Sequence, residues 1–159
     1  MRRIPVALLI AAMLFSLSAC GNASDQTQYL SLPFTAEARV SIESSEYLVS
    51  IAKGGANLVS VTVKYPEAFY GMTVSLGEES AAGFRGAKIT RGFPRSIAEL
   101  IYDAFNEANR TDVFSDGESE VVRFSSDRGS GSVRVDAFSS VPLSIESEGV
   151  YIEFTDFQR

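Results

Sequence analysis

Histidine and tryptophan are absent from this 159-residue chain, and cysteine occurs once. Without histidine, the chain lacks the commonest general base and the commonest metal ligand in proteins. A single cysteine cannot form a disulfide within the chain. Without tryptophan, stacking on a sugar ring would rest on tyrosine and phenylalanine alone. Most enzyme active sites would lack their usual residues here, so we expect a non-catalytic protein that needs no cofactor.

Positive charge is also scarce. Fourteen Lys and Arg residues stand against twenty Asp and Glu residues, which gives a formal net charge of −6. An acidic chain gains nothing from a phosphate-rich surface, so we expect no nucleic-acid partner and no direct adhesion to anionic lipid headgroups. Attachment to a membrane would therefore need another device.

The N-terminus supplies such a device. Arg2 and Arg3 precede an apolar run at residues 4–14, which is too short for a typical transmembrane helix. A basic start, a short apolar run and small residues before a cleavage site are typical of a secretory signal peptide. Residues 17–20 (LSAC) resemble the lipobox of bacterial lipoproteins.

Resemblance to that class implies cleavage before Cys20 and a diacylglyceryl group on its sulfur. The alternative is an ordinary signal peptide with an incidental cysteine. We predict a signal peptide at residues 1–19, a flexible tether with the lipidated Cys20 at residues 20–32, and a folded domain at residues 33–159. Loss of the two N-terminal arginines would change the net charge from −6 to −8. The lipid would hold the domain at the extracytoplasmic face of a cell membrane.

Beyond residue 33 the pattern is mostly that of strands. Apolar and polar residues alternate from Ala36, from Tyr47, from Val59 and from Tyr70, which predicts four half-buried strands separated by polar or glycine-rich turns. Weaker segments extend this series to six strands; they lie at residues 82–84 and 87–90. After residues 109–112 the strands return, and four more are expected; they lie at residues 121–125, 132–138, 142–145 and 150–155.

One segment departs from the period of two. Its apolar residues recur at helical spacing and predict one amphipathic helix over residues 97–108; they are Ile97, Leu100, Ile101, Ala104, Phe105 and Ala108. Ser96 and Glu99 have the spacing of a capping box at its start. The sheet is the large apolar partner available to this helix. The predicted fold class is α+β: a curled antiparallel sheet, or half-barrel, with one main helix packed on its concave face.

The order of elements and two local stretches resemble the LolA-like lipoprotein group, including its mycobacterial and Gram-positive relatives. The first stretch is residues 61–67 (VTVKYPE), which lead into residues 71–74 (GMTV). The second is residues 84–86 (FRG), followed by residues 94–96 (PRS) and the helix. The resemblance covers about residues 33–158. It implies an open half-barrel closed by helix, with an apolar cavity that holds acyl chains or lipoproteins.

The predicted function follows from this cavity: a membrane-anchored lipoprotein that binds or carries a lipid or another hydrophobic ligand. The candidate cavity-facing residues are Val40, Ile42, Val61, Val63, Met72, Val74, Phe105 and Phe124. Ordinary core packing predicts the same inward-facing residues. The alternative function is therefore an anchored interaction module with a closed core, which docks on another protein of the cell envelope.

The carboxylates give little sign of catalysis. Those at residues 78–79, and at 118 and 120, lie in predicted turns, whereas acid–base catalysis needs two carboxylates in different environments. Four acidic residues could bind calcium but lack the spacing of an EF-hand loop; they are Asp112, Asp116, Glu118 and Glu120. We predict neither a metal site nor a catalytic residue.

Overall fold

The structure is a computed structural model that describes residues 32–55, 58–77, 81–84, 87–88 and 92–159. The predicted signal peptide, Cys20 and the tether up to residue 31 lie outside the described residues. Within the described ranges, no helix has the length and apolar character needed to cross a membrane.

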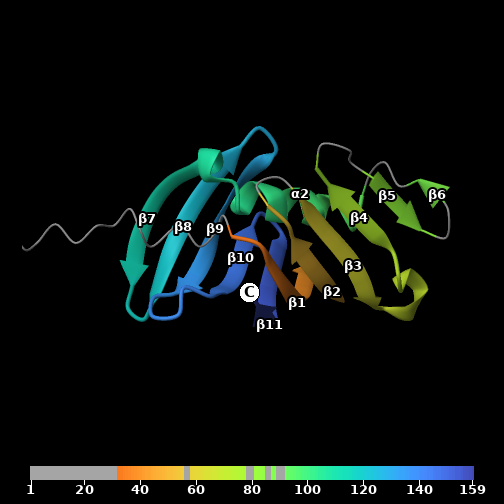
Figure 1. The fold of residues 1–159 in the computed structure, drawn as a ribbon, viewed down its shortest axis with the longest axis horizontal. Helices are drawn as coiled ribbons and strands as arrows, with labels where there is room; N and C mark the ends of the chain where they lie inside the picture. Colours follow the sequence, from red (N-terminus) through yellow and green to blue (C-terminus); the bar gives the residue numbers. More distant parts are fainter. Residues whose placement is uncertain (1–31, 56–57, 78–80, 85–86, 89–91) are drawn as a thin grey trace, which may run out of the picture.

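In the described part of the chain, eleven antiparallel strands form one sheet in the order β6-β5-β4-β3-β2-β1-β11-β10-β9-β8-β7. The strands are β1 (Phe34–Ile42), β2 (Ser45–Lys53), β3 (Val59–Tyr65), β4 (Thr73–Leu76), β5 (Ala81–Phe84), β6 (Ala87–Lys88), β7 (Arg110–Asp116), β8 (Ser119–Ser126), β9 (Gly129–Asp136), β10 (Pro142–Ser147) and β11 (Val150–Gln158). Strands that follow one another in sequence are neighbours, and β1 also pairs with β11 (Figure 1). The first and last strands therefore meet in the middle of the sheet. Among the described strands, β6 and β7 form the two edges and do not pair with each other, so the sheet is open.

The alternation of apolar and polar residues gives the sheet one apolar face. In β1, residues 34, 36, 38 and 40 are buried, whereas residues 35, 37 and 39 between them are exposed. The strand register then places Val40 opposite Ile152, and Ile51 opposite Val61. We call the face that carries these four side chains the inner face.

The α-helix of the described residues, α2 (Arg95–Ala104), lies across the inner face and contacts β3, β4, β8, β9 and β10 (Figure 1). Its apolar face is fully buried against the sheet, with Ile97, Ala98, Ile101 and Ala104 inaccessible to solvent. The prediction of a curled, mostly antiparallel sheet with one main helix is confirmed.

The ends of the helix differ from the prediction. The capping box is wrong, because the Glu99 carboxylate accepts a hydrogen bond from Arg95 Nε at 2.8 Å within the helix. The helix begins two residues earlier than predicted and ends at Ala104. Beyond it, the Asn106 side chain accepts a hydrogen bond from the Ala108 amide and starts a short 3-10 helix, η3 (Glu107–Asn109). That local bond redirects the chain before the predicted helix end at Ala108.

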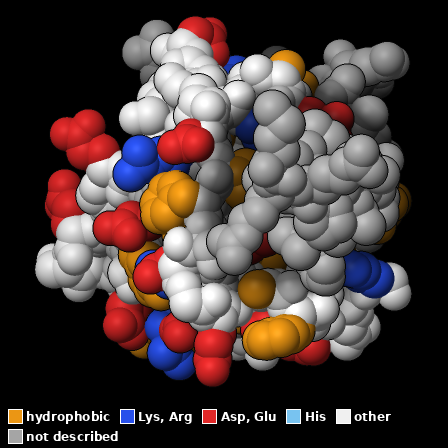
Figure 2. Space-filling view, turned by 90° about the vertical axis from the view of Figure 1, so that its left-hand side faces the viewer, with side chains coloured by type: hydrophobic (Ala, Val, Ile, Leu, Met, Phe, Trp, Pro, Cys, Tyr) orange, Lys and Arg blue, Asp and Glu red, His pale blue; other side chains and the backbone are white. Residues whose placement is uncertain are grey.

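Two strands also differ from the prediction. β4 begins at Thr73 instead of Tyr70, because the chain first makes a 3-10 turn, η2 (Glu67–Phe69), and then reverses at Gly71 with φ +80°. β7 was not predicted at all. It is an edge strand that is exposed on both faces, so it lacks the apolar alternation that predicts a strand. Figure 2 shows the side of the molecule that carries β7, where acidic and basic side chains are interspersed.

Gly131 in β9 has no room for a side chain. A Cβ atom there would overlap the Glu146 carbonyl oxygen and lie 2.7 Å from a ring carbon of Phe124. We therefore expect Gly131→Ala to lower the free energy of unfolding by about 2 kcal/mol, as other overpacked substitutions do. Gly55→Ala is the control, because its Cβ would meet nothing within 4 Å. Urea denaturation of both variants tests the prediction, and equal stabilities would contradict the packing of Phe124 over Gly131.

Candidate functional site

The predicted cavity residues fall into two groups. Six are 0–3% exposed: Val40, Val61, Val63, Val74, Phe105 and Phe124. Ile42 and Met72 are half-buried, and Met72 lies in the turn before β4. Apart from Val63, the six buried residues belong to one cluster that packs the sheet against α2. They all face the interior as predicted, but the neighbours that bury them are side chains of the protein itself. Contact with a ligand stays a prediction.

Aromatic side chains pack at the start of α2. Phe93, which precedes the helix, stacks on Tyr47 with ring centroids 4.0 Å apart. Phe69 of η2 lies 6.3 Å from Phe93 and 6.4 Å from Tyr47. This trio ties the chain before the helix to the β1–β2 hairpin and to the β3–β4 connection.

A second aromatic cluster lies at the end of α2. Phe105, which follows the helix, is 5.0 Å from Phe34 at the start of β1 and 6.2 Å from Phe154 of β11. Phe157 completes the cluster at 4.8 Å from Phe34. Aromatic pairs at such distances contribute about 0.5–1.5 kcal/mol each beyond their buried area. Both ends of the helix are therefore held by ring packing.

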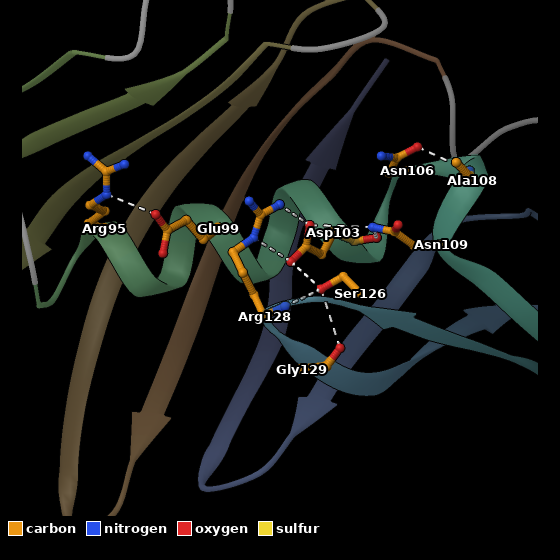
Figure 3. A network of polar contacts seen from close by, with 9 residues as sticks. All are labelled: Arg95, Glu99, Asp103, Asn106, Ala108, Asn109, Ser126, Arg128 and Gly129. Carbon is orange, nitrogen blue, oxygen red and sulfur yellow. Dashed lines mark hydrogen bonds and ion pairs between the residues drawn. The ribbon is translucent and has the colours of Figure 1, made fainter.

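A buried ionic contact holds the C-terminal half of the helix to the β8–β9 hairpin (Figure 3). Asp103 is 3% exposed and is the single buried acidic residue among those whose burial is described. Arg128 donates from Nε to Asp103 Oδ2 at 2.9 Å and from Nη2 to Oδ1, and Ser126 Oγ donates to Oδ2 at 2.8 Å. The Asn109 amide also donates to the Asp103 carbonyl oxygen at 3.2 Å. We call the contact between Asp103 and Arg128 the latch.

The two charged groups of the latch differ in how much each depends on the other. The hydrogen bond to Asp103 raises the pKa of the Arg128 guanidinium, which keeps its charge throughout the normal pH range. Arg128 remains 44% exposed on the surface, whereas the Asp103 side chain is almost completely buried. The buried carboxylate therefore depends on Arg128 much more than the guanidinium depends on Asp103.

Two small openings flank the helix. One of about 180 Å³, which we call the helix groove, is lined by Ser96, Glu99, Leu100, Asp103, Phe124, Arg128, Gly129, Ser147 and Val150. The other, of about 210 Å³, lies between α2 and the end of β4, near Leu76 and Arg95. Small-ligand sites usually measure about 300 Å³ or more. A longer ligand would therefore fit on the inner face only if α2 moved.

The acidic residues considered for calcium lie around the β7–β8 hairpin. Asp116 is ion-paired with Arg134 at 2.7 Å, and the Asp112 side chain accepts a hydrogen bond from the Val113 amide. Among the residues that the structure describes, no three His, Cys, Asp or Glu side chains are grouped as metal ligands would be.

The fold of this chain is similar to those of known structures, whereas its sequence matches no known family. No protein-family model matches the sequence, and no curated protein matches it significantly. An uncharacterized conserved protein from Thermus thermophilus superposes with a TM-score of 0.53 at 15% identity, over 85% of this chain and 83% of that one. A LolA superfamily protein from Nitrosomonas europaea superposes with a TM-score of 0.50 at 8% identity, over 84% and 90%. The domain has a LolA-like fold.

A third structure, MucB in complex with MucA(peri), matches less closely. Its TM-score is 0.47 at 11% identity, and this chain covers 53% of its length. Identities this low show the fold alone. The LolA-like fold agrees with the resemblance noted in the sequence, whereas the ligand of this chain has to be argued from its own residues.

Proposed function

We propose that this chain is a non-catalytic lipoprotein, anchored through Cys20 at the extracytoplasmic face of a cell membrane, whose half-barrel binds a lipid or another hydrophobic ligand. The ligand lies on the concave inner face, where α2 packs. The main observation in support of the proposal is the helix groove. Leu100, Phe124 and Val150 form an apolar wall of this groove at the boundary between the helix and the sheet. The LolA-like fold supports the same placement.

The minimum length of the ligand's alkyl chain follows from the cost of moving α2 away from the sheet. Moving α2 exposes three large buried side chains, those of Ile97, Ile101 and Phe105, at a cost of about 1.5–3 kcal/mol each. A buried methylene contributes about 0.8 kcal/mol. A chain of roughly six to eleven methylenes therefore offsets the exposure of the helix face. Shorter chains cannot displace the helix, so we expect binding to begin at about that length.

Native mass spectrometry tests this proposal. The mature chain, with Cys20→Ser to prevent lipidation, is purified without detergent and measured before and after lipid extraction. We expect extra mass that extraction removes, and we expect Leu100→Glu to abolish it, because a charge in the apolar wall of the groove disfavours an alkyl chain. Leu143→Glu, which changes an exposed leucine away from the groove, is the control. A mass without ligand, unchanged after incubation with membrane lipids, would contradict the proposal.

The anchor is tested separately in cells. Cys20→Ser should abolish incorporation of a radiolabelled fatty acid into the chain and release the protein from the membrane fraction, because the thiol that carries the lipid is gone. A variant with a substitution in the folded domain, Lys64→Met, should be labelled like the wild type. Unchanged membrane association of Cys20→Ser would contradict lipid anchoring.

A second candidate function is an anchored interaction module with a closed core. One observation favours it: the inner face is filled by the side chains of the protein, while large apolar side chains are exposed elsewhere, including Leu48, Tyr65 and Tyr151. Under this alternative, the mass spectrum shows no ligand, and crosslinking in cells captures an envelope protein on this exposed surface. Binding of a lipid that Leu100→Glu abolishes would decide against it.

A further inference from the structure

Phe138 is 87% exposed, the highest value among the large apolar side chains that the structure describes. It lies in the connection between β9 and β10. A single exposed apolar side chain on a protein surface is ordinary. Two observations set Phe138 apart: the loop that carries it is held by hydrogen bonds, and the chain that leads to Cys20 joins the domain at the same end of the sheet.

The loop around Phe138 is fixed by the Asp136 carboxylate. Asp136 Oδ1 accepts hydrogen bonds from the Phe138 amide at 3.2 Å, from the Ser139 amide at 2.7 Å and from the Ser139 hydroxyl at 2.8 Å. The Ala137 amide donates to the Glu118 carbonyl oxygen of the β7–β8 turn at 3.0 Å. The Phe138 ring is therefore presented to solvent by a braced loop.

The start of β1 and the C-terminus lie close to this loop. β1 pairs with β11 so that Thr35 lies opposite Gln158. The next residue, Arg159, donates a hydrogen bond from its guanidinium to the Ser140 carbonyl oxygen in the Phe138 loop, and the C-terminus lies next to β10 (Figure 1). The predicted tether therefore joins the domain at the end of the sheet that carries Phe138.

Two more exposed apolar side chains lie at this end, which we call the tether end (Leu32, Leu58, residues 137–141 and Arg159). Leu32 is 48% exposed, and its carbonyl oxygen accepts a hydrogen bond from Lys53 Nζ at 3.3 Å, which holds the chain where it enters the domain. Leu58 is 51% exposed and lines one open pocket together with Arg159. Exposed apolar side chains thus gather around the point where the tether joins.

The length of the tether limits how far this end can lie from a membrane that holds the Cys20 lipid. The chain from Cys20 to Leu32 spans at most about 40 Å when fully extended. A random chain of that length has its ends roughly 20 Å apart. The anchor therefore keeps the tether end at a high local concentration near the bilayer, where a weak apolar contact is enough to orient the domain.

The charges beside the loop indicate the kind of membrane contact. The carboxylates of Glu118 and Asp136 border the Phe138 loop and offset the guanidinium of Arg159. Anionic headgroups would gain little from this balance of charges. An aromatic ring, by contrast, is stabilised at the boundary between headgroups and acyl chains of a neutral lipid. The contact should therefore form on neutral lipid.

We propose that the tether end contacts the bilayer that holds the Cys20 lipid, and that the Phe138 ring inserts at the boundary between headgroups and acyl chains. This inference rests on the lipid anchor of the proposed function and adds the orientation of the domain on the membrane. The competing explanation is that Phe138 is an isolated surface residue that contacts only water.

The chain contains no tryptophan and one cysteine, which makes a direct test possible. Phe138→Trp and Tyr151→Trp each introduce one indole, and Tyr151 is 44% exposed at the other end of β11. Each mature chain is coupled through the Cys20 thiol to a maleimide lipid in phosphatidylcholine vesicles, with or without brominated acyl chains. We expect the emission of Phe138→Trp to shift to shorter wavelength on coupling and brominated lipid to quench it at least twofold, whereas Tyr151→Trp stays unquenched.

An unquenched indole in Phe138→Trp would overturn the proposal and indicate that Phe138 docks on a protein, since the vesicles contain none. Equal quenching of the two variants would also overturn it, because the domain would then have no preferred orientation. If Phe138→Trp fails to fold, hydrogen exchange of the wild type decides. Coupling to vesicles should slow exchange of the Phe138 and Ser139 amides at least threefold, and unchanged exchange would overturn the proposal.

Two features of this experiment separate the inference from the proposed function. Leu100→Glu, combined with Phe138→Trp, should keep the quenching although it abolishes ligand binding in the helix groove. Quenching that Leu100→Glu removes would mean that the indole reports on lipid in the groove, which overturns the inference. The maleimide lipid supplies the anchor itself, so the result does not depend on whether cells attach a lipid to Cys20.

Discussion

Arg128→Met should lower the free energy of unfolding by about 3 kcal/mol, more than Asp103→Asn at about 1–2 kcal/mol. The reason is the asymmetry of the latch. Without Arg128, the Asp103 carboxylate stays buried with a neutral hydroxyl and an amide as its remaining donors. Without the Asp103 charge, Arg128 is partly exposed and stays solvated. Urea denaturation of each variant gives the two values.

The double variant Arg128→Met with Asp103→Asn should be more stable than Arg128→Met alone, because it no longer buries an unpaired charge. Arg134→Met is the matched control, since Arg134 also forms an ion pair at 2.7 Å with Asp116, but both partners are exposed. Its cost should be about 0.5 kcal/mol. Equal costs for Arg128→Met and Arg134→Met would mean that the latch is an ordinary surface ion pair.

Ile101→Ala and Leu100→Ala should differ strongly, although the two residues are adjacent in one helix. Ile101 is fully buried against the sheet, so its truncation leaves a cavity and should cost about 3–4 kcal/mol. Leu100 is half-buried and borders the helix groove, so its truncation should cost about 1 kcal/mol. Thermal and urea denaturation of both variants measure the difference.

Leu100→Ala also bears on function. Because it removes apolar surface from the groove without unfolding the domain, it should weaken binding of a long alkyl chain several-fold. Ile101→Ala should loosen α2 and lower stability, while leaving the wall of the groove in place. Equal destabilisation by the two substitutions would contradict the orientation of α2 on the sheet.

Local sequence patterns predicted most of the strands. The period-two alternation in β1, β2 and β3 is strong because each of these strands has one buried and one exposed face. β7 escaped prediction because both of its faces are exposed, which removes the periodic signal. The capping box failed for a different reason, since Glu99 can pair with Arg95 as well as with an amide at the helix start, and spacing alone does not choose between them.

The candidate site was predicted less completely. Alternation showed which side chains, such as Val40 and Phe124, face inward, but the space left between inward-facing side chains depends on how the helix and sheet pack. Helical spacing puts Asp103 opposite the apolar stripe of α2, a side of the helix where carboxylates are usually solvated. Its burial comes from Arg128, a residue 25 positions away in a hairpin turn, and no local pattern records that contact. The burial of Lys53 was not predicted, because the two glycines that follow it favour a turn, whereas the structure places it at the end of β2.

Hydrogen exchange of the α2 amides tests most directly the claim that a long ligand enters the helix groove and moves this helix on the sheet. In the ligand-free mature chain, we expect the amides of Ile101 and Ala104 to be as protected as those of the central strands. Addition of a long-chain lipid should increase exchange in α2 at least tenfold and leave β1 and β11 protected, and short-chain lipids should have no effect. Unchanged protection of α2 while the lipid is bound would contradict the account.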